Sequence, residues 1–414
     1  MSVDVLNFGC RLNAAESEII QQHAESAQLS NAVIVNTCAV TGEAVRQARQ
    51  AIRRSRRERP EARIIVTGCA VQAYPQKFLE LPDVALVLGN DDKISAKLWR
   101  ELADDLADTP EMRGKSYVGD IMAATDMVAP QIERFAAHTR AFVQIQTGCD
   151  HRCTFCVIPF GRGNSRSLSP DEVIAQVRRV TEAGHREVVL TGVDITSYRP
   201  SLGALVKRIL KETPALERLR LSSIDSVEAD ADLLDAFAND ARLMPHLHLS
   251  LQHGDDLILK RMKRRHSRAD AISFCDQVRR LRPDVVFGGD IIAGFPTETE
   301  DAFARSLDLV DECGLTHLHV FPFSARPGTP AARMPQVAGE VVKDRARRLR
   351  QHGAAALARH LQGEIGATRR VLTERGGIGR TPQFTAVRLN APVEPGVMLD
   401  VGIAAHDGKQ LIAA

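Results

Sequence analysis

Cys149-Asp150-His151-Arg152-Cys153-Thr154-Phe155-Cys156 is the stretch of this chain that decides its fold. Its three cysteines follow the spacing C-x3-C-x2-C. Three thiolates can hold three irons of a cubane 4Fe-4S cluster and leave the fourth iron with an open coordination site. In sites with four cysteines every iron has a protein ligand, which suits electron transfer. An iron without a protein ligand lets a small molecule bind the metal directly. The spacing therefore predicts a cluster that takes part in chemistry.

A zinc site and three incidental thiols are the alternatives. Zinc prefers four ligands, which usually come as paired C-x2-C or histidine motifs. The only nearby fourth candidate is His151, which lies inside the loop itself. We therefore favour the iron-sulfur interpretation.

The triad resembles the signature of the radical S-adenosylmethionine (SAM) superfamily, including the aromatic Phe155 directly before the last cysteine. The resemblance implies that SAM chelates the open iron through its amino and carboxylate groups. One electron then cleaves SAM to methionine and a 5'-deoxyadenosyl radical. On this basis Phe155 is a candidate SAM contact, and Cys149, Cys153 and Cys156 are the predicted cluster ligands.

The totals limit the class of protein. A chain of 414 residues is long for one hydrophobic core, so we expect two or three domains. Hydrophobic residues make up 44% and charged residues 26%, which is typical of a soluble globular protein rather than a disordered or membrane-resident one. No apolar run approaches the ~20 residues of a spanning helix, and no secretory leader pattern is visible. We expect no membrane association and a cytoplasmic location.

A second set of cysteines lies near the start of the chain. Short apolar, β-branched runs alternate there with helical patterns, which predicts βαβ units around a parallel sheet. These runs lie at 3–8, 32–36, 63–67 and 84–88. Cys10, Cys38 and Cys69 follow the first three runs, at the carboxyl edge where open parallel sheets bind their ligands. Spacing alone leaves two interpretations open, a shared site or three unrelated buried cysteines.

The words around these cysteines resemble the amino-terminal domain of the methylthiotransferases. They read Asn7-Phe8-Gly9-Cys10-Arg11-Leu12-Asn13, Val35-Asn36-Thr37-Cys38-Ala39-Val40-Thr41 and Val66-Thr67-Gly68-Cys69-Ala70. The resemblance implies that Cys10, Cys38 and Cys69 hold a second 4Fe-4S cluster with one open iron. The first two words are closest to the branch that acts on N6-threonylcarbamoyladenosine beside the tRNA anticodon. The alternatives are the N6-isopentenyladenosine branch and the branch that modifies an aspartate of a ribosomal protein.

The resemblance also implies a mechanism with two roles for SAM. One SAM methylates a sulfur carried on the open iron of the amino-terminal cluster, and a second yields the radical that removes hydrogen from C2 of the adenine. The substrate radical then takes the methylthio group, so the two open irons must face one cavity. No catalytic side chain beyond the cluster ligands is expected, because this C–H bond is too weakly acidic for His or Glu. A non-enzymatic iron-sulfur sensor that binds RNA is the remaining alternative.

The central part of the chain has six strand-like runs separated by helical patterns. The runs lie at 141–146, 187–190, 218–221, 246–251, 285–292 and 317–321. Six β/α repeats fit a partial TIM-like barrel, two units short of a complete one. Sites in such barrels lie at the carboxyl ends of the strands, where the triad already falls.

Other residues at these strand ends are candidate SAM contacts by position and by resemblance. They are Thr191, Gly192, Ser223, Gln252 and Ile292. Ordinary packing at a strand end is the alternative for each of them. Relatives commonly have Pro and Ser where this chain has Ser250 and His253, which leaves the ribose contact open.

The carboxyl-terminal part changes character. Short β-like runs alternate with glycines there, which fits a small five-stranded barrel. The word Gly379-Arg380-Thr381-Pro382-Gln383-Phe384-Thr385-Ala386-Val387-Arg388 resembles the TRAM module, an RNA-binding barrel. The predicted organisation is an amino-terminal α/β domain, a linker, a radical SAM partial barrel and a TRAM-like barrel, at 1–110, 111–134, 135–362 and 363–414.

Basic residues gather in three groups, within 46–63, 260–268 and 343–350. Each group alone is typical of a solvated face, but three in one chain favour a nucleic-acid partner. Arg162 and Arg166 are predicted either to neutralise a phosphate or to balance cluster charge. Cys275 and Cys313 fall in helical patterns and are expected to be buried core residues. We expect a tRNA substrate, external electron and sulfur donors, and a monomer.

Overall fold

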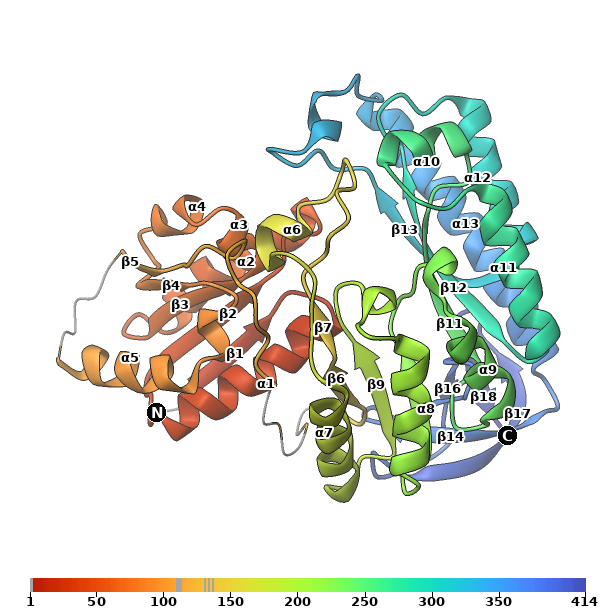
Figure 1. Ribbon diagram of the computed structural model, residues 1–414, viewed down its shortest axis with the longest axis horizontal. Helices are drawn as coiled ribbons and strands as arrows, with labels where there is room; N and C mark the ends of the chain where they lie inside the picture. Colours follow the sequence, from red (N-terminus) through yellow and green to blue (C-terminus); the bar gives the residue numbers. More distant parts are fainter. Residues whose placement is uncertain (1–2, 109–113, 130–131, 133–134, 136–137) are drawn as a thin grey trace.

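The computed structural model describes residues 3–108, 114–129, 132, 135 and 138–414. An amino-terminal sheet, a larger open barrel and a small closed barrel follow one another along the chain (Figure 1). This α/β architecture confirms the predicted fold class.

The amino-terminal sheet is parallel, and its strands lie side by side in chain order. The strands are β1 (Val3–Asn7), β2 (Ala32–Thr37), β3 (Arg63–Gly68), β4 (Leu86–Leu88) and β5 (Lys115–Tyr117). The helices are α1 (Arg11–Ser26), α2 (Gly42–Glu58), α3 (Cys69–Ala73), α4 (Gln76–Leu79) and α5 (Ala96–Asp108). Because side chains alternate along a strand, Ile34 packs in the core with α1 and α5, and Val33 and Val35 pack in the core with α2.

Strand β5 corrects one prediction. We expect 111–134 to be a linker, yet Lys115–Tyr117 pairs with β4 as the edge strand of the sheet. Lys115 and Ser116 are exposed, so this strand lacks the apolar alternation that reveals a strand in a sequence. The other domain boundaries stay predictions.

Six parallel strands build the open barrel within the described residues. They are β6 (Ala141–Gln144), β9 (Glu187–Thr191), β10 (Arg218–Leu221), β11 (His246–Gln252), β12 (Val286–Ala293) and β13 (Leu315–Pro322). They form two sheets, β10-β9-β6 and β11-β12-β13, which an isolated parallel pair, Ile224 with Leu249, joins. The predicted partial barrel is confirmed.

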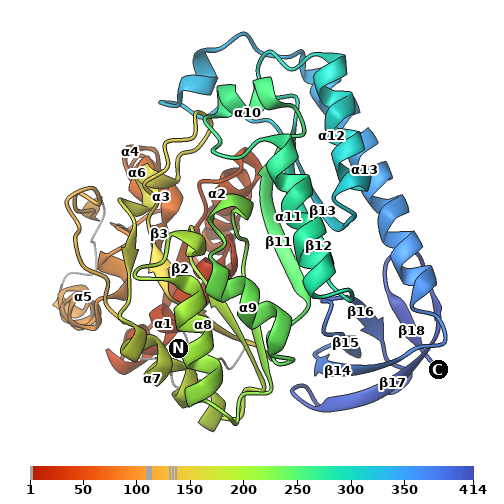
Figure 2. The same cartoon turned by 45° about the vertical axis from the view of Figure 1, so that its right-hand side comes forward.

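Helices cover the outside of this barrel (Figure 2). They are α7 (Pro170–Glu182), α8 (Leu202–Glu212), α9 (Ala231–Asn239), α11 (Arg268–Leu281), α12 (Glu300–Glu312) and α13 (Gly339–Gly363). Short elements connect the strands, namely β7 (Gln146–Thr147), α6 (Ile158–Arg162), β8 (Arg166–Ser167) and α10 (Asp256–Met262). On β11, Leu247 and Leu249 pack in the core with Phe274 of α11, so the alternate residues His246 and His248 face the barrel interior.

The carboxyl-terminal strands close into a small barrel in the order β14-β15-β16-β18-β17. They are β14 (Thr368–Glu374), β15 (Ile378–Arg380), β16 (Ala386–Arg388), β17 (Met398–His406) and β18 (Leu411–Ala413). Arg218 donates to the carbonyl of Arg380 at 3.1 Å, and Arg220 donates to the carbonyl of Pro382 at 3.0 Å. The small barrel is therefore attached to the amino ends of the large barrel's strands.

A buried ion pair supports this junction. The Glu187 carboxylate lies 2.9 Å from Nε of Arg220 and 3.5 Å from Nη1 of Arg218, and all three side chains are almost fully buried. Burial alone would raise the pKa of Glu187, but Arg220 overcomes that effect and the pKa is lowered. Glu187 therefore stays ionised and compensates the two arginines that hold the small barrel.

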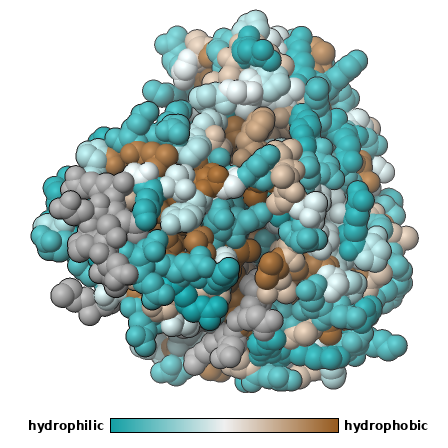
Figure 3. Space-filling view, turned by 60° about the vertical axis from the view of Figure 1, so that its left-hand side comes forward, coloured by the Kyte–Doolittle hydropathy of each residue, from teal (hydrophilic) through white to brown (hydrophobic). Residues whose placement is uncertain are grey.

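None of the described helices is both long and apolar enough to span a bilayer. The face shown in Figure 3 is mainly hydrophilic, with apolar side chains in small separate patches.

Replacing Glu187 with Ala should destabilise the protein by about 3–5 kcal/mol, because it leaves Arg218 and Arg220 buried without a counter-charge. Urea unfolding measures the loss. The control is Glu217→Ala, which removes partly exposed ion pairs to Arg186 and Arg370 and should cost less than about 1 kcal/mol. Equal losses in the two variants would contradict the role given to the buried pair.

Candidate active site

The three amino-terminal cysteines lie together at the carboxyl edge of the first sheet. In the strand register, Asn7 pairs with Asn36 and Thr37 pairs with Gly68. Cys38 directly follows β2 and Cys69 directly follows β3. Cys10 precedes α1, whose Asn13 donates to the carbonyl of Thr37 at 2.9 Å. Three neighbouring strand ends thus bring the cysteines to one site, which is the first of the two interpretations that spacing alone left open.

Arg162 connects two of these cysteines from the other side of the domain boundary. Its Nε lies 3.0 Å from Sγ of Cys69, and its Nη2 donates to Oδ1 of Asn13 at 2.8 Å. The same Asn13 oxygen lies 3.9 Å from Sγ of Cys10. Arg162 belongs to α6, which follows the second triad, so one guanidinium joins the two halves of the site.

The surroundings of Arg162 are charged and closed to solvent. Its Nη2 also lies 2.8 Å from Oε2 of Glu16, and Nζ of Lys93 lies 2.6 Å from the same oxygen. Two cations thus face one carboxylate in the interior, which leaves an excess of one positive charge beside Cys69. Of our two predictions for Arg162, balancing the cluster charge fits this position; contact with a phosphate does not, because the side chain is buried.

Burial controls the protonation of the amino-terminal thiols. Cys10 is an exposed residue, but desolvation of its Sγ raises the pKa, an effect that Arg162 opposes; Cys38 is buried, which raises its pKa to about 12, with Cys69 adding to the effect. These two thiols therefore hold their protons at neutral pH unless a metal displaces them. Metal binding would release those protons.

The second triad lies in the loop between β7 and α6. The amide of Cys149 donates to the carbonyl of Gly163 at 3.1 Å, and the amide of Ile158 donates to Sγ of Cys156 at 3.4 Å. Gly148 has a φ of 72°, and a side chain there would clash with the carbonyl of Asn164. Backbone contacts and a left-handed glycine therefore shape the loop that presents the cysteines.

Charged side chains surround this loop. Sγ of Cys149 lies 3.8 Å from Asp194, and Sγ of Cys153 lies 3.8 Å from Nη1 of Arg264. Burial, with Asp194 adding to it, raises the pKa of Cys149 to about 12. Burial also raises the pKa of Cys156 to about 11. These thiols, too, would lose protons on binding a metal.

Both sets of cysteines fit a 4Fe-4S cluster with one open iron. Of the eight cysteines in the chain, only Cys275 and Cys313 lie outside the two triads, and both are fully buried. They interact with each other, so neither triad gains a fourth thiol. Nε2 of His151 lies 3.2 Å from Asp194 and 3.4 Å from Glu228. The imidazole that would be the fourth zinc ligand therefore already interacts with two carboxylates. The donor sets therefore favour iron over zinc.

Helix α6 lies between the triads. It starts two residues after Cys156, is five residues long and ends at Arg162. A Cβ built on Gly161 would lie 3.2 Å from Cβ of Cys69, and Val157 shares a core with Cys69. The two cysteine sets therefore flank one short helix. The sequence predicts both sets but not this helix contact.

The structure places the predicted SAM contacts along the carboxyl rim of the barrel. Phe155 and Ile292 share an apolar cluster with Phe295, whose ring centroid lies 6.4 Å from that of Phe155. Gln252 ends β11 with a φ of 68°, a conformation that is uncommon outside glycine and often marks functional sites. Thr191 is buried at the end of β9.

Two predicted contacts have structural roles or neighbours that the sequence does not reveal. A Cβ on Gly192 would lie 2.8 Å from the carbonyl of Gln146, so close packing alone explains this glycine. Ser223 is half-buried, and Asp225 beside it binds Arg264 at 2.6 Å. Arg264 in turn lies against Cys153, so this charged pair supports the triad. Whether any of these residues binds SAM stays a proposal.

Comparisons with known proteins agree with this arrangement. Residues 143–310 match the family described as Radical SAM superfamily, and residues 2–89 match Uncharacterized protein family UPF0004. The chain is 46% identical over 393 residues to the threonylcarbamoyladenosine tRNA methylthiotransferase MtaB of Rickettsia prowazekii, covering 94% of this chain and 91% of the relative. The chain belongs to the radical SAM methylthiotransferase family.

Other members of this methylthiotransferase family are more distant. The Bacillus subtilis protein of the same name is 32% identical, over 86% of this chain and 80% of its own length. A tRNA-2-methylthio-N(6)-dimethylallyladenosine synthase of Sorangium cellulosum is also 32% identical, over 89% and 81% of the two chains. The fold resembles that of the radical S-adenosylmethionine methyltransferase TsrM from Kitasatospora setae, with a TM-score of 0.59 at 15% identity over 80% of this chain and 77% of that one.

Replacing Cys10, Cys38 and Cys69 together with Ala should halve the iron of this methylthiotransferase, from about eight to about four per chain, since each 4Fe-4S site holds four irons. Iron analysis after anaerobic reconstitution measures the change. The variant should still cleave SAM under dithionite but should insert no sulfur into substrate.

The matched control is Cys275→Ala, which changes a buried cysteine outside both sets and should keep the full iron content. Unchanged iron in the triple variant would contradict a cluster at the amino-terminal cysteines.

Proposed function

We propose that this enzyme adds a methylthio group to C2 of N6-threonylcarbamoyladenosine beside the anticodon of tRNA. The observation that carries the proposal is the 46% identity, over nearly the full length of both chains, to a relative named for this reaction. The dimethylallyladenosine synthases match at 32% or less, which ranks that substrate second. The ribosomal aspartate and the non-enzymatic sensor rank below both.

The two cysteine sets define what the cofactors would do. When bound, 4Fe-4S clusters supply one-electron chemistry on SAM at Cys149, Cys153 and Cys156, and a sulfur-binding iron at Cys10, Cys38 and Cys69. The protein's own residues hold these groups and control their surroundings. Arg264 balances charge beside Cys153, and Arg162 does so beside Cys69.

The chain also provides an apolar wall beside the second triad. Phe155, Ile292 and Phe295 form it, with Phe323 packed on Phe295 at 5.5 Å between ring centroids. Such a wall excludes water from a reactive radical and offers a surface on which an adenine ring can stack. We propose that SAM binds along this wall, with Gln252 as the polar contact at its edge.

The basic group on α2 offers exposed charges in a regular row. Arg49, Arg53 and Arg57 are exposed at four-residue intervals on α2, and none makes an ion pair with any residue that the structure describes. Arg345 of the third group is buried against Glu298 at 2.8 Å, so its charge is already compensated. We propose that the α2 arginines contact tRNA phosphates.

Further parts of the proposal rest on the family alone. An external reductant and an external sulfur source are required by the chemistry, and we propose that the enzyme acts as a monomer in the cytoplasm, where its tRNA substrate is found.

Deleting the gene should leave tRNA with threonylcarbamoyladenosine and without its 2-methylthio form, since no other step would add the group. Nucleoside mass spectrometry of total tRNA measures both species. Complementation with the wild-type chain should restore the 2-methylthio form, and complementation with the Cys149→Ala variant should not. A deficit confined to the isopentenyl series would assign the enzyme to the second-ranked substrate.

A further inference from the structure

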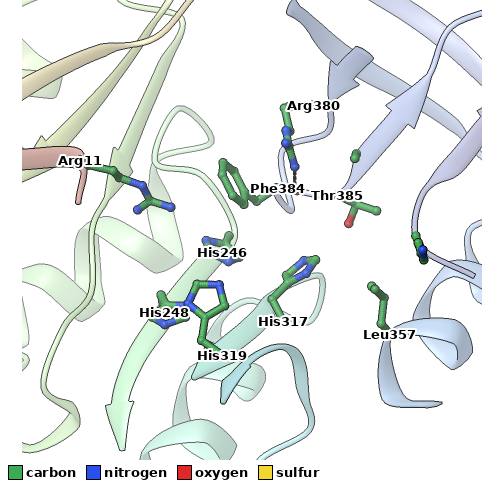
Figure 4. Close-up of a pocket in the computed structure, with 11 residues that line it drawn as sticks. Arg11, His246, His248, His317, His319, Leu357, Arg380, Phe384 and Thr385 are labelled. Carbon is green, nitrogen blue, oxygen red and sulfur yellow. Dashed lines mark hydrogen bonds between the residues drawn. The ribbon is translucent and has the colours of Figure 1, made fainter. Parts of the chain in front are cut away.

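A cavity of about 210 Å³ lies inside the large barrel, and none of the six triad cysteines lines it. It takes its walls from three parts of the chain: Arg11 at the start of α1, four histidines of β11 and β13, and Arg380, Phe384 and Thr385 of the small barrel (Figure 4). At ~30 Å³ per water in the liquid, this volume corresponds to about seven waters. It has room for a substituent the size of a small amino acid, and the mechanism above does not use it.

The cavity lies next to the reactive centre. Arg11 directly follows Cys10, and in Figure 4 its guanidinium reaches toward Phe384 and His246. On β12, the side chain of Asp290 shares the inner face with Ile292, two residues nearer the carboxyl rim. The barrel interior therefore runs from the proposed SAM wall, past Asp290, to Arg11 and Phe384.

Positive charge gathers at the inner end of this cavity. Four guanidinium groups surround the Phe384 ring, with distances to its centroid of 5.4 Å from Arg11, 4.9 Å from Arg140, 5.0 Å from Arg220 and 4.9 Å from Arg380. The nearby carboxylates are already engaged: Glu187 binds Arg220 and Arg218, whereas Glu374 binds Arg140 at 3.2 Å and Arg380 at 3.1 Å. Arginines thus outnumber carboxylates here.

Arg11 differs from the other arginines of this group in its contacts. No hydrogen bond or ion pair reaches its guanidinium from any described residue, although Arg140, Arg220 and Glu187 act on it electrostatically and the Phe384 ring lies 5.4 Å away. Arg11 is half-buried, and beside it Nη1 of Arg140, Nδ1 of His246 and Nε2 of His317 are buried without a partner among the residues described. Unpartnered buried polar groups are costly, so a ligand that accepts hydrogen bonds and carries negative charge would complete the site.

The histidines along the wall do not supply that negative charge. Nε2 of His248 lies 2.7 Å from Oδ1 of Asp290, and Nδ1 of His319 lies 3.2 Å from the same oxygen. Two imidazoles of the wall thus engage the carboxylate of Asp290, which is not itself among the lining residues. They also fix ring nitrogens at defined places for a polar ligand.

We propose that this cavity receives the N6 substituent of the target adenine and that Arg11 binds the substituent's carboxylate. The inference rests on the proposed function. A threonylcarbamoyl group carries an α-carboxylate that is ionised at neutral pH, together with hydroxyl and amide groups. A dimethylallyl group is neutral and apolar, so it would leave Arg11 without a partner. An arginine-rich cavity therefore selects the first substituent over the second.

The test compares three anticodon stem-loops with the reconstituted enzyme: one with threonylcarbamoyladenosine, one with its carboxylate converted to the amide, and one with unmodified adenosine. The amide should lower kcat/KM about tenfold to a hundredfold relative to the acid, since it removes one charged hydrogen bond. This arm uses the wild-type protein and does not depend on the folding of a variant. An amide that reacts as well as the acid would overturn the inference.

The second arm uses Arg11→Gln, with Arg11→Lys as the conservative variant. The Gln variant should lose a similar factor on the acid and little on the amide or on unmodified adenosine, and Lys should recover part of the loss. A merely structural role would lower all three substrates alike, and that result would contradict the inference. The matched control is Arg359→Gln, an exposed arginine paired with Asp311, which should not change the ratios.

The proposed function and the role of the cavity can be contradicted separately. If the wild-type enzyme methylthiolates only dimethylallyl substrates, the proposed function is wrong. If it methylthiolates the threonylcarbamoyl substrate but acid and amide react equally, only the role of the cavity is wrong.

Discussion

Arg162 is the side chain on which the active site depends. It is the last residue of α6, and its side chain contacts Cys69, Asn13 and Glu16 of the amino-terminal part of the chain. A buried guanidinium without partners would cost several kcal/mol, so the two domains must meet in this register to satisfy it. The same contact sets the distance between the cysteine triads, because α6 starts beside one triad and ends beside the other. Chemistry that needs two metal sites near one substrate atom thus rests on an ion pair and a five-residue helix.

A second constraint acts at the opposite end of the barrel. The small carboxyl-terminal barrel inserts Phe384 among arginines of the other two parts of the chain, with Arg11 from the amino-terminal domain and Arg140 and Arg220 from the barrel. The ring separates like charges that would otherwise repel one another in a partly desolvated space. A module that resembles an RNA-binding barrel therefore also closes the interior of the enzyme. This arrangement connects the choice of substrate to the assembly of all three parts.

Much of the fold and both cysteine sets could be predicted from the sequence, because the sequence patterns that reveal them are local. The spacing of Cys149, Cys153 and Cys156 lies within eight residues, and the strand runs alternate with helical patterns over short windows. Strand β5 was missed because its exposed residues carry no apolar pattern. The contact between Arg162 and Cys69 joins residues 93 positions apart in the sequence. Hydrophobic periodicity does not predict contacts between such distant residues. The inward histidines did leave a signal, since His246-Leu247-His248 and His317-Leu318-His319 repeat one alternating word on two strands. The two segments become neighbours only in the folded barrel, which the repeat itself does not predict.

Iron-edge anomalous diffraction from an anaerobically reconstituted crystal would show directly whether each cysteine triad holds a cluster. We expect two iron-rich peaks, one at each cysteine triad, on either side of α6. At 1.5 Å rise per residue the helix is about 7.5 Å long, so the peaks should lie within about 15 Å of each other. A single peak at Cys149, Cys153 and Cys156, or two peaks on opposite faces of the molecule, would contradict this expectation.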